Sequence, residues 1–215
     1  MADLSILHLY PQTLRLNGES GNVVALAVRA TAMGLAVKLS AVDVGEPLPS
    51  KRPHVVFLGS GTLAGTLLAA ADLQGKSDVI HQWVAKGTKV LAVGSGFDLV
   101  SQGLDLLDGS GEVALDSGLA GFINSNRAIR RGTGKFDLGE VVASDISEIV
   151  GYVDGYRDGK VMASNVQGPL LPMNPTLADE LISWVYPNIQ KTEDLKKYDR
   201  LASKARAAIA SRVGN

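Results

Sequence analysis

The side chain best placed to do chemistry is Ser95, which stands between Gly94 and Gly96. Residues 90–93 before it form a short apolar run, which predicts a buried strand. The apolar residues after it recur at helical spacing: Phe97, Leu99, Val100, Leu104, Leu106 and Leu107. A glycine turn between strand and helix lies at the carboxyl edge of a sheet, where many α/β enzymes hold a nucleophile beside backbone amides.

A second glycine turn, Gly59-Ser60-Gly61, follows the apolar run 54–58. A lone turn of this kind is more often structural than functional. Ser95 suggests a serine hydrolase, although its flanks do not read Gly-x-Ser-x-Gly. No histidine follows it, so an imidazole would have to come from earlier in the chain; the three histidines are His8, His54 and His81.

The composition excludes several functional classes. The chain has 215 residues and a net charge of −1, which gives no electrostatic case for nucleic-acid binding. Zero cysteines exclude disulfides, thiolate metal sites and a cysteine nucleophile. We expect no cofactor, no membrane span and no signal peptide, and therefore a cytoplasmic protein.

The elements that would position the turns alternate along the first half of the chain. Apolar patterns predict strands at 4–10, 35–42, 54–58 and 90–93, and helices at 23–33, 63–73 and 76–86. Such alternation favours a parallel sheet with helices on both faces. From residue 108 glycine is frequent, and we predict short strands at 138–143, 149–153 and 160–166. Helices are predicted at 177–185, with Asn174 as N-cap and Pro175 at N1, and at 192–213.

Two segments resemble class I glutamine amidotransferases of the cobyric acid synthase (CobB/CobQ) type, and most of all their lipid II-amidating, GatD-like members. Residues 92–101 read Ala-Val-Gly-Ser-Gly-Phe-Asp-Leu-Val-Ser, against the family's Ala-Ile-Cys-Gly-Gly-Tyr-Gln-Leu-Leu-Gly. Residues 166–175 read Val-Gln-Gly-Pro-Leu-Leu-Pro-Met-Asn-Pro, against Leu-His-Gly-Pro-Leu-Leu-Pro-Lys-Asn-Pro. Residues 9–11, 18–22 and 119–125 match further family stretches. The resemblance implies a flavodoxin-like α/β fold.

The resemblance also assigns the site. The family's catalytic cysteine falls on Gly94 and its general base histidine on Gln167. Glycine carries no nucleophile, and an amide cannot accept a proton as imidazole does. The positions expected to line the substrate site are Gly59, Ser60, Gly61, Ser95, Gly96, Asn124 and Arg127. Three polar residues of the family are replaced by Ile123, Ser125 and Ala128.

The resulting hypothesis is a catalytically degenerate amidotransferase-like subunit. The resemblance implies a Mur-ligase-like or other amide-forming synthase as partner, in peptidoglycan or cobyric-acid-type amidation. The alternatives are a serine hydrolase using Ser95 and a small-anion-binding protein. The latter would use the turn Gly94-Ser95-Gly96, called the elbow from here on, which lacks the family's cysteine. The sequence also leaves a homo-oligomer open.

The C-terminal segment has its own character. We divide the chain into an amidotransferase-like domain at 1–190 and a basic helix at 191–215 that belongs to or packs on it. The helix is either a solvated face or a docking surface for an acidic partner. Its basic residues are Lys191, Lys196, Lys197, Arg200, Lys204, Arg206 and Arg212.

Overall fold

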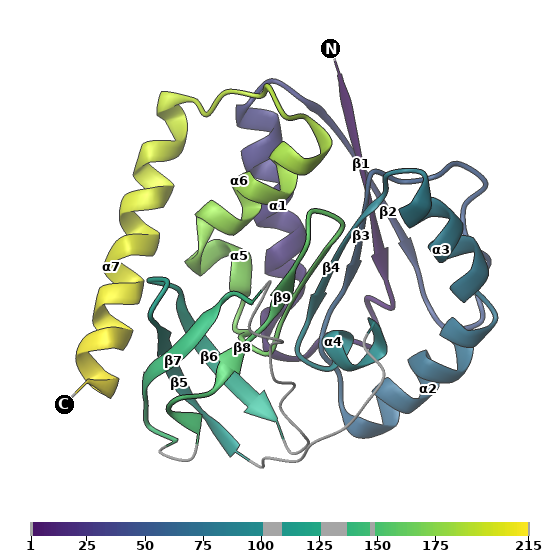
Figure 1. The fold of residues 1–215 in the computed structure, drawn as a ribbon. Helices are drawn as coiled ribbons and strands as arrows, with labels where there is room; N and C mark the ends of the chain where they lie inside the picture. Colours follow the sequence, from purple (N-terminus) through teal and green to yellow (C-terminus); the bar gives the residue numbers. More distant parts are fainter. Residues whose placement is uncertain (1, 101–108, 126–136, 147–148, 215) are drawn as a thin grey trace.

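The main sheet is parallel apart from one edge strand. The computed structural model describes residues 2–100, 109–125, 137–146 and 149–214 (Figure 1). The order of strands is β2 (Ala36–Val42), β1 (Asp3–Leu9), β3 (Val55–Leu58), β4 (Lys89–Val93), β10 (Val161–Ser164) and β9 (Tyr156–Arg157). The first five run parallel and β9 is antiparallel. This order confirms the predicted flavodoxin-like fold.

Helices cover both faces of this sheet, as predicted. The alternation of side chains along β1 sends Ile6 into one core and Leu7 into the other. The Ile6 core holds α1 (Ser20–Ala32), α5 (Leu170–Met173) and α6 (Pro175–Val185); the Leu7 core holds α2 (Leu63–Gln74) and α3 (Ser77–Ala85). Because β3 and residues 90–93 of β4 are buried on both faces, their sequences are continuously apolar rather than alternating.

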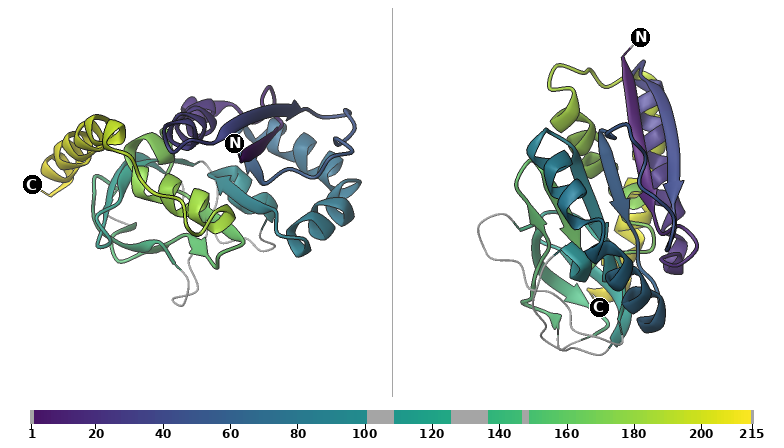
Figure 2. Two further views of the ribbon diagram at one scale, coloured as in Figure 1. Left: turned by 90° about the horizontal axis from the view of Figure 1, so that it is seen from above. Right: turned by 90° about the vertical axis from the view of Figure 1, so that its right-hand side faces the viewer.

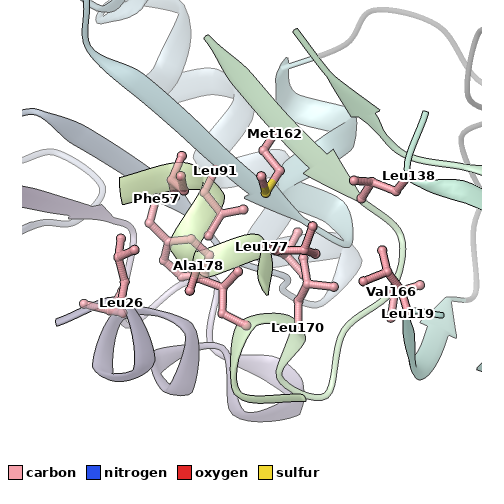
Figure 3. Close-up of a cluster of buried hydrophobic side chains, with 14 of the residues drawn as sticks. Leu26, Phe57, Leu91, Leu119, Leu138, Met162, Val166, Leu170, Leu177 and Ala178 are labelled. Carbon is pink, nitrogen blue, oxygen red and sulfur yellow. The ribbon is translucent and has the colours of Figure 1, made fainter. Parts of the chain in front are cut away.

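A second, antiparallel sheet of four strands was not predicted. Its order is β6 (Ala120–Ser125), β5 (Gly109–Leu115), β7 (Gly139–Ser144) and β8 (Val153–Asp154). The sequence indicated β7, but glycines within β5 and β6 hid their strand pattern, and 149–152 lies outside any strand. Figure 3 shows that Leu138 and Leu119 continue the core of Phe57 and Leu91, so the two sheets share one core.

The predicted helix after the elbow is only partly within the described residues. Helix α4 spans Ser95–Val100, while Leu104, Leu106 and Leu107 lie outside the described ranges. Asn174 occupies the N-cap position of α6 and Pro175 its first turn, as predicted, but the Asn174 side chain makes no cap hydrogen bond. It instead binds the backbone N–H and carbonyl of Ala120 in β6, at 3.0 and 2.9 Å.

The C-terminal helix α7 (Lys196–Val213) follows the 3₁₀ turn η3 (Glu193–Leu195) and packs beside the second sheet and α5 (Figures 1 and 2). Arg29 of α1, only 3% exposed, holds it in place. Its guanidinium donates two 2.6 Å hydrogen bonds to Asp179 of α6 and one of 2.9 Å to Asp199 of α7. Among the described residues, no helix is both long and apolar enough to cross a bilayer.

We predict that Asn174→Ala loosens the segment 169–175. The change leaves a buried N–H and C=O of Ala120 without partners, which costs roughly 2 kcal/mol. Urea unfolding measures the loss, and hydrogen exchange should show weaker protection of residues 170–174. Asn188→Ala, at an exposed position, is the matched control. Equal stability of both variants would contradict this role of Asn174.

Candidate functional site

The elbow lies where the sequence analysis placed it, between β4 and α4 at the carboxyl edge of the parallel sheet. Gly94 has φ of +56°, a conformation that favours glycine. Its N–H donates to the Ser164 carbonyl at 2.8 Å, and its carbonyl accepts from the N–H of Phe97 at 2.9 Å. These bonds fix the turn between the neighbouring strand β10 and the first turn of α4.

The space that a side chain at Gly94 would need is already filled. A Cβ atom built there would lie 2.6 Å from Ser60 Oγ, 2.7 Å from Ser60 Cβ and 2.9 Å from Gln167 Cδ. Real Cβ atoms do not approach neighbours this closely. Three positions assigned to the site therefore converge, and a side chain at Gly94 would require the side chains of Ser60 and Gln167 to shift.

The other glycines of the two turns have packing roles. A Cβ at Gly96 would lie 2.6 Å from the Leu58 carbonyl oxygen and 2.7 Å from that of Gly59. At Gly61 the nearest backbone atom would be the Thr13 carbonyl oxygen, at 2.8 Å. Glycine is therefore needed wherever these loops touch, with or without catalysis.

Gln167 is held in a closed ring of amide groups. Its Oε1 accepts a hydrogen bond from Asn17 Nδ2 at 2.7 Å, and its Nε2 donates to the Asn124 carbonyl at 3.0 Å. Asn124 Nδ2 closes the ring by donating to Asn17 Oδ1 at 3.1 Å. The ring joins the 3₁₀ turn η1 (Leu16–Gly18), strand β6 and the loop after β10. At 1% exposure, Gln167 is a fixed part of the interior.

Ser95 is buried and its hydroxyl is engaged. Ser95 Oγ accepts the Gly61 N–H at 2.9 Å and lies 2.9 Å from the Thr66 hydroxyl. Its own N–H donates to Ser60 Oγ at 3.2 Å. With 3% of its surface exposed, Ser95 is not presented to a substrate.

The three histidines have other surroundings. His8 in β1 contacts Phe57 in a tilted arrangement, with 4.9 Å between ring centroids, and burial lowers its pKa to about 4. His54 bonds Ser5, and His81 is exposed on α3. In the described part of the chain, no hydrogen bond joins Ser95 to a histidine.

Glu19 is a buried carboxyl beside the glycine loop that the sequence analysis did not assign to the site. Its side chain packs on Gly59, and Asn22 Nδ2 donates to its Oε2 at 3.1 Å. Burial raises its pKa to about 9, and the Ser60 backbone and Asn22 side chain offset only part of that rise. The carboxyl is therefore neutral near pH 7. The match of residues 18–22 to a family motif was the available signal.

The assigned positions that the structure brings together form one cluster: Gly59, Ser60, Gly61, Gly94, Ser95, Gly96 and Gln167, with Asn124 joined through Gln167. Arg127 and Ala128 lie outside the described residues, as does the side chain of Ser125. Ile123 belongs to the core. Asn17 and Thr66, which sequence reasoning missed, complete the cluster. No group of three or more metal-ligating side chains occurs within the described ranges.

The pKa of Glu19 predicts how stability depends on pH. Between the ordinary value of 4.5 and about 9 the unfolded chain is ionised at this residue and the folded chain is not. The free energy of unfolding should therefore fall by about 1.4 kcal/mol per pH unit in this window, through Glu19 alone. Glu19→Gln removes that slope, so its advantage over the wild type should grow by roughly 2–3 kcal/mol from pH 6 to pH 8.

Urea unfolding at both pH values measures this difference. Glu193→Gln, at an exposed carboxylate in η3, is the matched control and should keep the wild-type slope. Parallel pH profiles of Glu19→Gln and the wild type would show that Glu19 ionises normally in the folded protein.

The chain is similar to two curated proteins over most of its length. No family model matches it. It is 24% identical to the lipid II isoglutaminyl synthase (glutamine-hydrolyzing) subunit GatD of Streptococcus pneumoniae (strain ATCC BAA-255 / R6), over 94% of this chain and 93% of that protein. It is 21% identical to the protein of the same name from Staphylococcus aureus (strain N315), over 85% and 84% of the two chains.

Among solved structures, that of SMU.1228c superposes with a TM-score of 0.52 at 14% identity, covering 99% of this chain and 100% of the other. This likeness shows that a similar fold occurs in another protein. The chain is therefore similar over most of its length to two GatD subunits of glutamine-hydrolyzing synthases, and its strand order is flavodoxin-like.

Proposed function

We propose that this chain is a non-hydrolysing, GatD-like subunit of a synthase that amidates lipid II. The observation that carries the proposal is the filled space at Gly94. The elbow presents backbone alone, and the volume beside it belongs to Ser60 and Gln167. A glutaminase of the resembled family needs a thiolate at this position to attack the substrate carboxamide.

The second requirement of that reaction is a base, and Gln167 cannot serve as one. Its amide does not titrate near neutral pH. Both of its polar atoms are already bonded to Asn17 and Asn124, so its orientation is fixed by the protein. The two partners that start the reaction are therefore both replaced by groups without acid–base or nucleophilic chemistry.

Three backbone amides of the site are also engaged. The N–H of Gly61 donates to Ser95 Oγ, that of Ser95 to Ser60 Oγ and that of Gly94 to the Ser164 carbonyl. An oxyanion or a bound anion would have to displace these bonds, and one oxyanion donor is worth about 10²–10³ in rate. This argues against the small-anion-binding alternative as well as against hydrolysis.

The serine hydrolase alternative has no support from the geometry. The Ser95 hydroxyl is buried against Gly61 and Thr66, whereas a nucleophilic serine needs an imidazole or another base within hydrogen-bond reach. We therefore propose the role of a non-hydrolysing subunit and no hydrolytic activity.

The role of the subunit is binding or regulation within a complex. Both curated relatives are named as subunits of a lipid II isoglutaminyl synthase. We propose a Mur-ligase-like synthase as the partner and the cytoplasm as the location, and prefer lipid II amidation to cobyric-acid-type amidation because of those names. Segment 169–175 matches the family motif and anchors α6 to β6 through Asn174. This structural role explains why the motif would persist without catalysis.

We predict no glutamine hydrolysis by the purified chain. Incubation with glutamine, followed by a coupled ammonia assay, should give the rate of the protein-free blank. The pneumococcal synthase, which is named as glutamine-hydrolyzing, is the positive control. Ammonia release at an ordinary enzymatic rate would refute the proposed function.

A second prediction uses an engineered thiol. Gly94→Cys with Gln167→His restores both family residues but leaves Ser60 in the space of the thiol. Adding Ser60→Gly should open that space and let the imidazole activate the thiol. Alkylation of this triple variant by iodoacetamide at pH 7 should then be at least about tenfold faster than alkylation of the control. The control is Ser60→Gly with Gly94→Cys, which lacks the histidine. Equal rates with and without the histidine would show that residue 167 does not face residue 94.

A further inference from the structure

A groove between α1, α5 and α7 is separate from the elbow. Its cavity volume is about 460 Å³, and its lining side chains are apolar apart from Arg29 and the hydroxyl of Tyr198. The guanidinium of Arg29 is already bonded to Asp179 and Asp199. The principal lining side chains are Val24, Val28, Leu171, Met173, Tyr198 and Leu201.

The two walls of the groove expose large apolar side chains to solvent. On α1, Val24 is 57% and Val28 42% exposed; on α7, Leu201 is 64% and Tyr198 43% exposed. Single exposed apolar residues are ordinary, but four that face one groove make a patch of the kind that binds another molecule. A small ligand fits this lining poorly, because such sites add a few free polar groups that orient the ligand.

The charged side chains beside the groove indicate which kind of partner would bind there. Lys197 Nζ lies 4.9 Å from the ring centre of Tyr198, and Arg206 donates to the Met173 carbonyl, so both cations border the lining. Neither has an acidic partner among the residues that the structure describes, whereas Arg29 and Lys191 are balanced by Asp179 and Asp199.

This excess of positive charge argues against a second copy of the chain. A symmetric dimer through the groove would place the unbalanced Lys197 and Arg206 of both copies in one interface, and like charges in an interface are unfavourable. An acidic partner would neutralise them. The lining runs from Gly21 to Arg29 on α1 and from Tyr198 to Ala205 on α7, which is about two helical turns at 1.5 Å per residue.

We infer that this groove receives an amphipathic helix with acidic flanks from the partner synthase subunit. That the helix comes from the synthase subunit rests on the proposed function. The shape and charge of the groove are independent of it. Apolar side chains at i, i+3, i+4 and i+7 would enter the groove between α1 and α7, and carboxylates beside them would meet the cations of α7. The basic C-terminal helix thus serves as a docking surface.

The test uses the full chain and synthetic peptides of about 15 residues, long enough to be helical when bound. The first peptide has a leucine stripe at that spacing with glutamate and alanine elsewhere. The second has lysine in place of glutamate, and the third has the first composition scrambled so that no stripe forms. Fluorescence anisotropy at 150 mM salt measures each affinity. Only the first should bind in the micromolar range, with the others at least about tenfold weaker.

Protein variants locate the binding. Leu201→Glu should weaken the first peptide at least about tenfold. Leu67→Glu on α2, at a position of similar exposure (61%), should not. Failure of the first peptide to bind would overturn the inference, as would equal binding of the scrambled peptide or equal effects of the two variants. The assay contains no glutamine and no synthase, so its failure is distinguishable from ammonia release, which would overturn the proposed function instead.

Discussion

The close approach of three chain segments at Gly94 is the constraint on which the rest of the site depends. The end of β3, the turn after β4 and the loop after β10 meet so that a single added carbon would lie within 3 Å of both Ser60 and Gln167. Because protein interiors are close-packed, a side chain at Gly94 could be accommodated only if the side chains of Ser60 and Gln167 moved. The glycines around it, which resemble a catalytic signature, are the residues that allow the loops to touch.

Polar groups within this region bind one another. The amide ring of Asn17, Gln167 and Asn124 joins the 3₁₀ turn, the second sheet and the segment that leads into α5. The hydroxyls of Ser60 and Ser95 accept hydrogen bonds from nearby backbone N–H groups, and burial keeps Glu19 uncharged beside the Gly59–Gly61 loop. An active site keeps unsatisfied donors and strained groups ready for a ligand, at a cost in stability. Here most of the polar groups bind one another, and Glu19 Oε1 is a buried atom without a hydrogen-bond partner among the described residues.

The sequence predicted the parallel sheet and its helices because the spacing of apolar residues in helices and the apolar runs of buried strands are local signals. Residues 54–58 and 90–93 could be recognised as buried strands without knowing their neighbours. The second sheet escaped notice because its strands carry glycines and because β5 and β6 are held by pairing with each other. Asn174 was expected to cap α6, but its side chain binds Ala120, more than fifty residues earlier. Convergence of Ser60, Gly94 and Gln167 followed from the resemblance; the contact distances that fill the elbow did not. Asn17 was missed because its role arises only from long-range contacts, and Glu19 because a local motif match does not show that its carboxyl is buried beside Gly59.

The most direct measurement of the central claim is a double-mutant cycle between residues 60 and 94, read as the free energy of unfolding in urea. Gly94→Ala introduces the Cβ atom that meets Ser60, and it also places a side chain at φ of +56°. The filled elbow predicts a loss of roughly 2–4 kcal/mol for Gly94→Ala, and a favourable coupling of at least about 1 kcal/mol when Ser60→Gly removes the obstructing side chain. Additive effects of the two substitutions, or a Gly94→Ala variant as stable as the wild type, would contradict the account.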